Sequence, residues 1–228
     1  MIDLTTWELS IPTPSAISHV STQQLNNGYQ SRYFKQNADG SVTFWSPVTG
    51  STSKGSKFPR SELRETDANG ARIFWRYPEA DNKISAVLTI NRVPSTSKII
   101  IGQIHSKDEP GSMRDPLLKI LYRQVDGIGR VEAVLRKHPG DKHCKSTLLV
   151  DNVQPGDRFG YQARLTTDGQ LSVVSSTSDG DFGKLNANVS PWKKQSLYFK
   201  AGAYLGDNSG NHSDGGRVTF HWLNTAHR

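Results

Sequence analysis

Short runs of alternating polar and apolar side chains recur along this chain and leave little room for a helical fold. Ser41–Trp45 and Lys83–Ile90 follow a period of two, and Gly169–Val174 follows it less strictly. Such alternation, with many β-branched and aromatic residues, is typical of half-buried β-strands. Lys98–His105 is richer in apolar residues, which indicates a strand that is buried on both faces or nearly so. No stretch keeps a 3.6-residue period over three helical turns, so we expect an all-β protein.

Turn signals separate these runs. Each contains a residue that tolerates a positive φ angle, as tight turns between strands require. The signals are Asn26–Gly28, Ala38–Gly40, Asp126–Gly127, Thr167–Gly169 and Ser178–Gly180. Strands at this spacing predict an antiparallel sandwich or barrel. We expect short helical turns only near Ser21–Leu25 and Pro191–Gln195.

The chain has 228 residues, which is enough for one large all-β domain with a substantial core. Its hydrophobic share of 34% and charged share of 21% are those of a soluble globular protein. Gly50–Lys57 and Asn208–Gly216 look like loops, but neither is long enough to separate two domains. We therefore expect a single domain over residues 1–228.

The formal net charge of +7 favours polyanionic partners, which include nucleic acid, anionic lipid and acidic polysaccharide. No apolar run approaches the length of a membrane span. Met1–Leu4 lacks a basic segment followed by an apolar one, so the sequence shows no signal peptide. We expect a monomer without membrane association, which is either cytoplasmic or a secreted or periplasmic protein whose leader has been trimmed.

Cys144 is the only cysteine, so no intrachain disulfide can form. His138 and His143 lie nearby, but these three residues do not have the spacing of a known metal site. We therefore expect neither a metal nor another cofactor.

Three segments carry candidate chemistry, and the first is Arg60-Ser61-Glu62-Leu63-Arg64. On a strand, Arg60, Glu62 and Arg64 share one face. Two guanidinium groups around one carboxylate form a preorganised anion site, in which the glutamate holds the arginines and the arginines bind a substrate carboxylate. An exposed salt-bridge ladder would give the same pattern.

The second segment is Gln103-Ile104-His105, at the end of the apolar run. Gln103 and His105 share a face, and they combine a group that can hydrogen-bond a carboxylate with a potential base. A histidine with a purely structural role would also fit this short pattern.

The third segment is Tyr198–Leu205. Tyr198, Lys200, Gly202 and Tyr204 fall on one face, and the residues between them look like core. An ammonium near a phenol favours the phenolate and makes the tyrosine a better proton carrier. Gly202 leaves a gap in the polar face, where we expect a ligand to approach the backbone. An amphipathic strand with a polar outer face is the structural alternative.

In this order the three segments resemble the signature blocks of polysaccharide lyase family 7, the alginate lyases. The resemblance runs from the Asp3–Trp7 opening to the final strand near Arg217–Trp222. It implies a β-jelly roll of two antiparallel sheets with a substrate groove on the concave face. The third block departs from the family pattern, because Gly206 stands where a glutamine is usual, and this removes one expected sugar contact.

The resemblance also implies a reaction, the β-elimination of alginate, in which the C5 proton is removed and the C4 glycosidic oxygen is expelled. Hydrogen bonds and positive charge at the uronate carboxylate let negative charge spread onto it as the proton leaves. Gln103 and Arg60, with Arg64, are expected to contact this carboxylate. His105 is expected to act as base or carboxylate partner, and Tyr204 as the acid. In mannuronate, where the C5 hydrogen and C4 oxygen are syn, Tyr204 could act both as the base that removes the C5 proton and as the acid that protonates the leaving oxygen.

The remaining residues of the three blocks are expected to bind the substrate and to order the other side chains of the site. Lys200 would support Tyr204 and bind uronates, Tyr198 would contact the substrate, and Glu62 would order the arginines. In the family that the sequence resembles, an isoleucine at position 104 is associated with guluronate-containing substrates, so the resemblance implies that preference.

Four rival functions remain open. A glycoside hydrolase needs two carboxylates across the scissile bond, and Glu62 is the only one on the polar face of these segments. A non-catalytic polyuronate-binding module, or a lyase of a related polymer such as polyglucuronate, would use the same cationic residues. Nucleic-acid binding fits the charge, but the sequence has no recognised motif of that class.

Sugar preference and product length are expected to depend on the loops Gly50–Lys57, Asp108–Asp115 and Asn208–Gly216.

Overall fold

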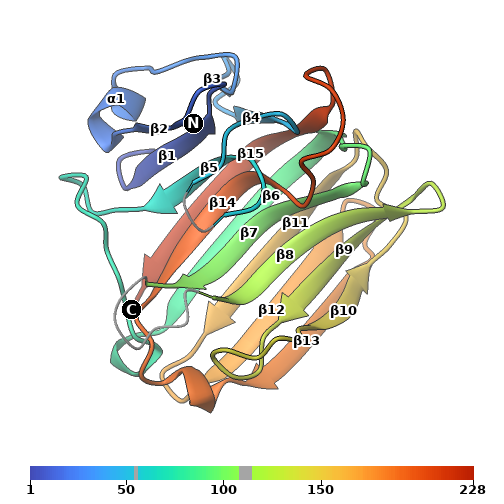
Figure 1. The fold of residues 1–228 in the computed structure, drawn as a ribbon. Coiled ribbons are helices and arrows are strands. Elements are labelled where there is room, and N and C mark those ends of the chain that lie inside the picture. Colours follow the sequence, from blue (N-terminus) through green and yellow to red (C-terminus); the bar gives the residue numbers. More distant parts are fainter. Residues whose placement is uncertain (54–55, 108–114) are drawn as a thin grey trace.

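The computed structural model describes residues 1–53, 56–107 and 115–228, which form two antiparallel β-sheets packed face to face (Figure 1). The eight-stranded sheet has the order β10 (Lys145–Val150), β9 (Ile128–Leu135), β8 (Pro116–Val125), β7 (Lys98–Ser106), β14 (Leu197–Leu205), β5 (Arg60–Glu65), β1 (Trp7–Pro12) and β2 (Ile17–Val20). The seven-stranded sheet has the order β13 (Phe182–Asn188), β12 (Gln170–Thr177), β11 (Arg158–Leu165), β6 (Asn82–Arg92), β15 (Gly215–His227), β4 (Val42–Pro47) and β3 (Phe34–Gln36). The predicted all-β architecture of two antiparallel sheets is confirmed.

The alternating and apolar runs of the sequence lie in strands β4, β6, β7 and β12, as predicted. The glycines of the five turn signals all have positive φ angles, between 78° and 96°. These glycines are Gly28, Gly40, Gly127, Gly169 and Gly180. Four of these turns join consecutive strands, as predicted, whereas Gly28 follows the end of a short helix, Thr22–Asn26, and not a strand.

The helical turns are short. α1 (Thr22–Asn26) begins after Ser21, whose side chain accepts from the backbone of Gln24 in a capping box. The 3-10 turn η2 (Ser190–Trp192) lies at the second predicted position, and η1 (Tyr77–Glu79) was not predicted. Among the described residues no helix has the length and apolar character needed to cross a bilayer.

The core fills the space between the two sheets. On β14 the side chains of Phe199, Ala201, Ala203 and Leu205 are fully buried. Burying one large apolar side chain contributes roughly 1.5–3 kcal/mol to the stability of the fold, so the burial of these residues fixes which face of β14 is turned toward the core. Because neighbouring residues of a strand point to opposite sides, the polar residues of β14 are forced onto the face turned away from the core.

Glu65, at the end of β5, ties the two sheets together inside this core. Its carboxylate accepts from the indole Nε1 of Trp75 and from the backbone N–H of Phe199, each at 3.1 Å. It also lies 2.7 Å from Nε2 of His227 on β15, whose Nδ1 is 2.6 Å from Oδ1 of Asn82 on β6. A buried carboxylate with three partners holds β5 against β14 and against the second sheet.

Candidate active site

The three chemical segments of the sequence lie on neighbouring strands. β7, β14 and β5 are adjacent at the centre of the eight-stranded sheet, although they are far apart along the chain (Figure 1). The register pairs Lys200 with both Gln103 and Arg64, so that these three residues form one row across the strands. Opposite residues on one face have Cβ atoms about 4.5–5.5 Å apart, which brings their polar groups within reach of one another.

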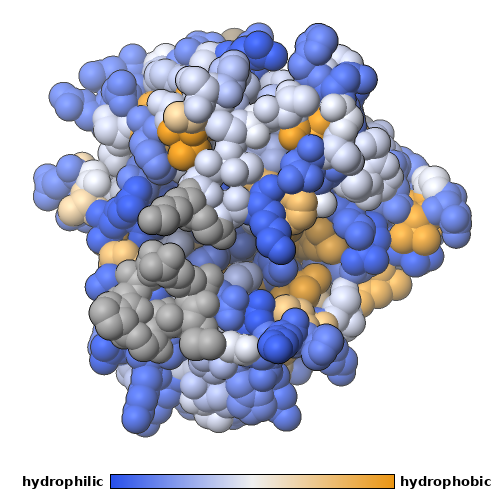
Figure 2. Space-filling view, viewed as in Figure 1, coloured by the Kyte–Doolittle hydropathy of each residue, from blue (hydrophilic) through white to orange (hydrophobic). Residues whose placement is uncertain are grey.

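All eight predicted site residues lie together on this sheet. They are Arg60, Glu62, Arg64, Gln103, His105, Tyr198, Lys200 and Tyr204. The same side of the molecule is mostly hydrophilic in the space-filling view and is hollowed near its middle, where hydrophobic residues show (Figure 2). Strand alternation thus gathers the polar residues, and the sheet order brings the three segments side by side.

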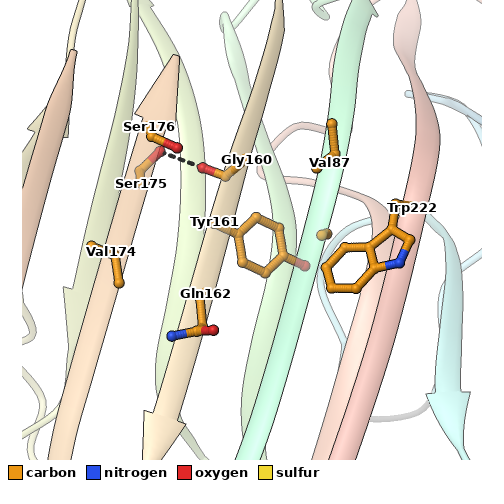
Figure 3. A pocket seen from close by; sticks show the side chains of 9 residues that line it. Val87, Gly160, Tyr161, Gln162, Val174, Ser175, Ser176 and Trp222 are labelled. Atoms are coloured by element: carbon orange, nitrogen blue, oxygen red, sulfur yellow. Dashed lines mark hydrogen bonds between the residues drawn. The ribbon is translucent and has the colours of Figure 1, made fainter. Parts of the chain in front are cut away.

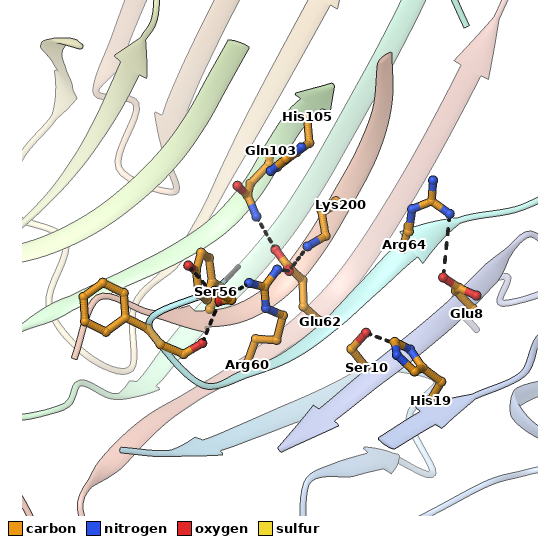
Figure 4. Close-up of polar contacts among 12 residues, drawn as sticks. Glu8, Ser10, His19, Ser56, Arg60, Glu62, Arg64, Gln103, His105 and Lys200 are labelled. Carbon is orange, nitrogen blue, oxygen red and sulfur yellow. Dashed lines mark hydrogen bonds and ion pairs between the residues drawn. The ribbon is translucent and has the colours of Figure 1, made fainter. Parts of the chain in front are cut away.

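Glu62 is the hub of the cluster, and its side chain is only 1% exposed. Gln103 Nε2 donates to Glu62 Oε1 at 2.6 Å, and Arg60 Nη1 lies 3.3 Å from Oε2. Lys200 forms an ion pair with the same Oε2, so that three side chains converge on one carboxylate (Figure 4). Burial opposes ionisation of Glu62, but the charges of Lys200 and Arg60 outweigh it, and the pKa of Glu62 lies below its ordinary value.

His105 is held as a neutral ring. Its Nδ1 lies 2.8 Å from the backbone carbonyl of Ser106, and a carbonyl can only accept, so Nδ1 carries the hydrogen and Nε2 keeps its lone pair. Burial, followed by the nearby charge of Lys200, lowers the pKa of His105 to about 4. The ring stacks on Tyr198, with 5.4 Å between ring centroids. His105 can therefore accept a proton or a hydrogen bond at Nε2.

Tyr204 lies beneath a guanidinium group. The Cζ atom of Arg60 is 4.1 Å from the centroid of the Tyr204 ring, whereas Lys200 forms its ion pair with Glu62. Arg60 is thus the cation that stacks on Tyr204, a contact for which the sequence suggested Lys200. The Tyr204 hydroxyl is also 3.3 Å from Oγ of Ser56, which in turn accepts from Arg60.

Sequence reasoning missed Ser56, because a serine in a Ser- and Gly-rich loop carries no signal of its own. It also missed Phe74, whose ring lies 4.8 Å from the Arg64 guanidinium. The Cζ atom of Arg64 also lies 4.1 Å from the centroid of the Tyr198 ring, and its Nη1 atom lies 3.7 Å from Oε1 of Glu8. Only the fold brings these partners to the arginine.

Lys200 has a pKa of about 8, lowered first by burial and then by the charge of Arg60. It is only 6% exposed. The three cations Arg60, Arg64 and Lys200 outnumber the two carboxylates that contact them, so the site favours an anionic ligand.

Gly202 does not have the predicted role of leaving a gap for a ligand. A Cβ atom at this position would lie 2.5 Å from the carbonyl oxygen of Ser61 and 2.7 Å from Cα of Glu62. The φ angle of Gly202 is +151°, at an irregularity in the pairing of β14 with β7. The space beside Gly202 is therefore filled by the backbone of β5, and glycine is needed for that close approach.

No group of three or more His, Cys, Asp and Glu side chains in the described ranges could hold a metal ion. His138 instead contacts Asp141 at 3.1 Å. Of the predicted specificity loops, residues 54–55 and 108–114 lie outside the described part of the chain.

A second hollow, of about 210 Å³, lies on the outer face of the seven-stranded sheet (Figure 3). Trp222, Val87, Gln162 and Ser176 are among the residues that line it, and none of the described residues in its lining is charged. Its described lining therefore lacks the cations and the histidine that the eight-stranded sheet carries.

Known proteins are similar to this chain both in sequence and in fold. Residues 2–227 match the family model described as alginate lyase. An alginate lyase of Klebsiella pneumoniae is 25% identical over 287 residues, which cover 99% of this chain and 89% of the relative. The crystal structure of an alginate lyase from Pseudomonas aeruginosa is 44% identical, with a TM-score of 0.93 and coverage of 99% of this chain and 100% of that one.

A family 7 alginate lyase solved with the product GGG is 29% identical, with a TM-score of 0.85 and coverage of 100% of this chain and 97% of that one. The agreement in fold confirms the predicted jelly roll. Since the family model spans nearly every residue, the chain belongs to the alginate lyases of polysaccharide lyase family 7 and is a polysaccharide lyase.

Proposed function

We propose that this protein, acting as one domain, cleaves alginate by β-elimination on the outer face of the eight-stranded sheet, across β5, β14 and β7. One observation carries the proposal: a neutral His105 and the phenol of Tyr204 belong to one cluster of cations organised around an ionised Glu62. A uronate needs such a combination, because its C5 proton is acidic only when the adjacent carboxylate is neutralised.

Arg60 and Gln103 bind the carboxylate of the sugar that is cleaved. Both are anchored through Glu62, which fixes their positions before the substrate arrives. Preorganised donors of this kind need no rearrangement as charge develops, and they typically provide several kcal/mol of transition-state stabilisation. Arg64, Lys200 and Tyr198 bind the substrate beside them.

His105 and Tyr204 transfer the protons. For guluronate, whose C5 hydrogen and C4 oxygen are anti, Nε2 of His105 takes the proton and Tyr204 protonates the leaving oxygen. For mannuronate, where the two groups are syn, Tyr204 enters the step as the phenolate, takes the C5 proton and passes the same proton to the leaving oxygen. A ring with a pKa of about 4 is a weak base, but the incoming carboxylate offsets the charges of Lys200 and Arg60 and makes the ring more basic.

Alginate is the substrate that the relatives support. One relative, the family 7 alginate lyase A1-II', has been solved as variants with the product GGG and with the substrate GGMG. The electrostatics disfavour a two-carboxylate hydrolase, because Glu62 is buried, ionised and already engaged with three donors. Polyglucuronate is the rival substrate, since the same cations would bind it.

The purified enzyme is mixed with polymannuronate, polyguluronate or polyglucuronate in the presence of a chelator. The ultraviolet absorbance of unsaturated uronate ends is then followed over time. We expect a rise with alginate polymers, and a loss of about 10²–10⁴-fold in Tyr204→Phe with binding retained. Tyr29→Phe, on the segment after α1, is the matched control and should keep full activity. Unchanged turnover in Tyr204→Phe would remove Tyr204 from the mechanism, and a rise with polyglucuronate alone would replace the substrate.

A further inference from the structure

The outer face of the seven-stranded sheet carries a group of cations that the proposed reaction does not use. Arg92 lies at the end of β6, Arg217 on β15, Lys35 on β3 and Arg32 in the turn before β3, and all four are exposed. We call these four residues the outer cation patch. Because β6, β15, β4 and β3 are neighbours in that order, the patch extends over four strands, on the sheet that packs behind β5, β14 and β7 (Figure 1).

Trp45 on β4 forms the base of the patch. The Cζ atoms of Arg217 and Arg92 lie 5.0 Å and 5.6 Å from the centroid of its ring, which is only 8% exposed. A guanidinium group over an indole is attracted by the ring quadrupole, so both arginines are held on the face of the sheet. A hollow of about 180 Å³ beside the ring is also lined by Arg32 and Lys35.

The charge of the patch is not compensated. Arg92 and Arg217 are register partners, directly opposite each other on β6 and β15, and like charges in that position cost stability. None of the ion pairs formed among the described residues includes a member of the patch. Four exposed cations without a carboxylate partner create a local positive field, which attracts an anion.

The arrangement of the cations fits an extended polyanion better than a single small anion. Neighbouring strands are about 4.8 Å apart, so the three strand spacings from Arg92 on β6 to Lys35 on β3 amount to about 14 Å. One small anion cannot contact cations that are this far apart. A chain with a charge on every unit can meet them in turn.

The groups beside the patch favour a sugar polymer over a nucleic acid. Thr219 Oγ1 donates to Oδ1 of Asn91 at 2.8 Å and lies 2.9 Å from Oγ1 of Thr43. Thr43 and Thr219 are register partners in the row next to Arg217, on the same face, where they can exchange hydrogen bonds with sugar hydroxyls. Single-stranded nucleic acid needs exposed aromatic rings on which bases stack, but the Trp45 ring is covered by two arginines.

We propose that the outer cation patch is a second, non-catalytic binding surface, which holds a polyuronate chain through its carboxylates. The choice of polyuronate rests on the proposed function, because the substrate of the other sheet is the polyanion that this protein meets. A chain held on the seven-stranded sheet keeps the enzyme beside neighbouring segments of the polymer, which raises the effective concentration of those segments at the eight-stranded sheet. A short oligosaccharide cannot reach both faces, so it gains nothing from the patch.

The first test compares KM for polymeric alginate with KM for a uronate tetrasaccharide in Arg92→Gln/Arg217→Gln, in which the side-chain stems still cover Trp45 but the charges are gone. We expect KM for the polymer to rise about three- to tenfold, the effect of losing two exposed ion pairs, with kcat and the tetrasaccharide KM within a factor of two. Arg92→Lys/Arg217→Lys keeps the charge and should restore most of the affinity. Lys193→Gln/Lys194→Gln, which removes two exposed charges from the turn after η2, is the control and should leave both KM values unchanged.

Salt separates an electrostatic effect from a structural one. At 1 M salt the Debye length is about 3 Å, so the ratio of polymer KM between Arg92→Gln/Arg217→Gln and the unmodified enzyme should approach one. Melting curves verify that each variant is folded. A ratio that keeps its low-salt value, or a tetrasaccharide KM that rises as much as the polymer KM, overturns the proposal.

The second test reads binding without turnover, in proteins that also carry Tyr204→Phe. On a column of immobilised polyguluronate, Arg92→Gln/Arg217→Gln should elute at a lower salt concentration than the parent protein, and on immobilised DNA the two should elute together. A loss of retention on DNA that equals or exceeds the loss on polyuronate replaces the polysaccharide with a nucleic acid.

The results separate the two proposals. Unchanged polymer KM together with unchanged retention on polyuronate overturns the second surface even if the enzyme cleaves alginate. Weaker retention of Arg92→Gln/Arg217→Gln, in a protein whose unmodified form cleaves no polyuronate, keeps the surface and refutes the proposed reaction.

Discussion

Replacing Glu62 by glutamine tests whether the hub carboxylate organises the active site. The substitution keeps the shape of the side chain but leaves Lys200 and Arg60 without their shared counter-ion in a buried place. Removing one partner of a buried ion pair typically costs about 3–5 kcal/mol. For a chain of this size 1 kcal/mol shifts the melting temperature by roughly 2–4 °C, so Glu62→Gln should melt about 6–20 °C lower at pH 7.

The pH dependence of this deficit identifies its cause. The pKa of Lys200 is about 8 in the folded protein, below the ordinary lysine value of 10.5, so folding releases a proton between these pH values and stability rises with pH across that window. Without Glu62 the pKa falls further, so the rise is larger and the deficit of the variant should shrink by pH 10. Differential scanning calorimetry at pH 7 and pH 10 measures both, with the exposed Glu79→Gln as control. A variant that melts within 2 °C of the unmodified protein at pH 7, or whose deficit is the same at both pH values, refutes the reasoning.

Three further predictions rest on single contacts. Ser56→Ala should lower kcat by roughly five- to tenfold with little change in KM, because one neutral hydrogen bond that orients the Tyr204 hydroxyl is lost; an unchanged kcat would show that Ser56 has no part in positioning. In the unmodified enzyme kcat/KM should fall as the pH passes 8, since Lys200 loses the charge that we propose to bind uronates, and a profile flat to pH 10 would contradict this. Glu65→Ala should reduce the free energy of unfolding by about 2–5 kcal/mol in urea titrations, because buried donors of Trp75 and Phe199 lose their acceptor, and a loss below 1 kcal/mol would contradict that role.

Much of the fold could be predicted because its signals are local. Alternation in β4 and β6 reflects the two faces of each strand, and the positive φ angles at Gly40 and Gly169 follow from what only glycine adopts at low cost. The same alternation assigned the polar residues of β14 to one face, which the burial of Phe199 and its neighbours enforces.

The partners within the site could not be predicted, because they join positions that are distant along the chain. Nothing near Arg60 in the sequence indicates that its guanidinium stacks on Tyr204 while Lys200 pairs with Glu62. Ser56 likewise becomes a hydrogen-bond partner only where its loop meets β14.

The sequence by itself determined the all-β class, the position of strands such as β4, β6, β7 and β12, and the polar face of the segments that carry the family motifs, because side-chain periodicity and turn geometry are properties of neighbouring residues. The tertiary structure decided which strands are adjacent, and with that every charge pairing in the site. It also separated two glycines of the same strand region: Gly202 is required because the backbone of β5 lies against it, whereas Gly206 borders open space. The physical reason is that contacts between strands depend on sheet order and register, which are fixed only when the whole core packs.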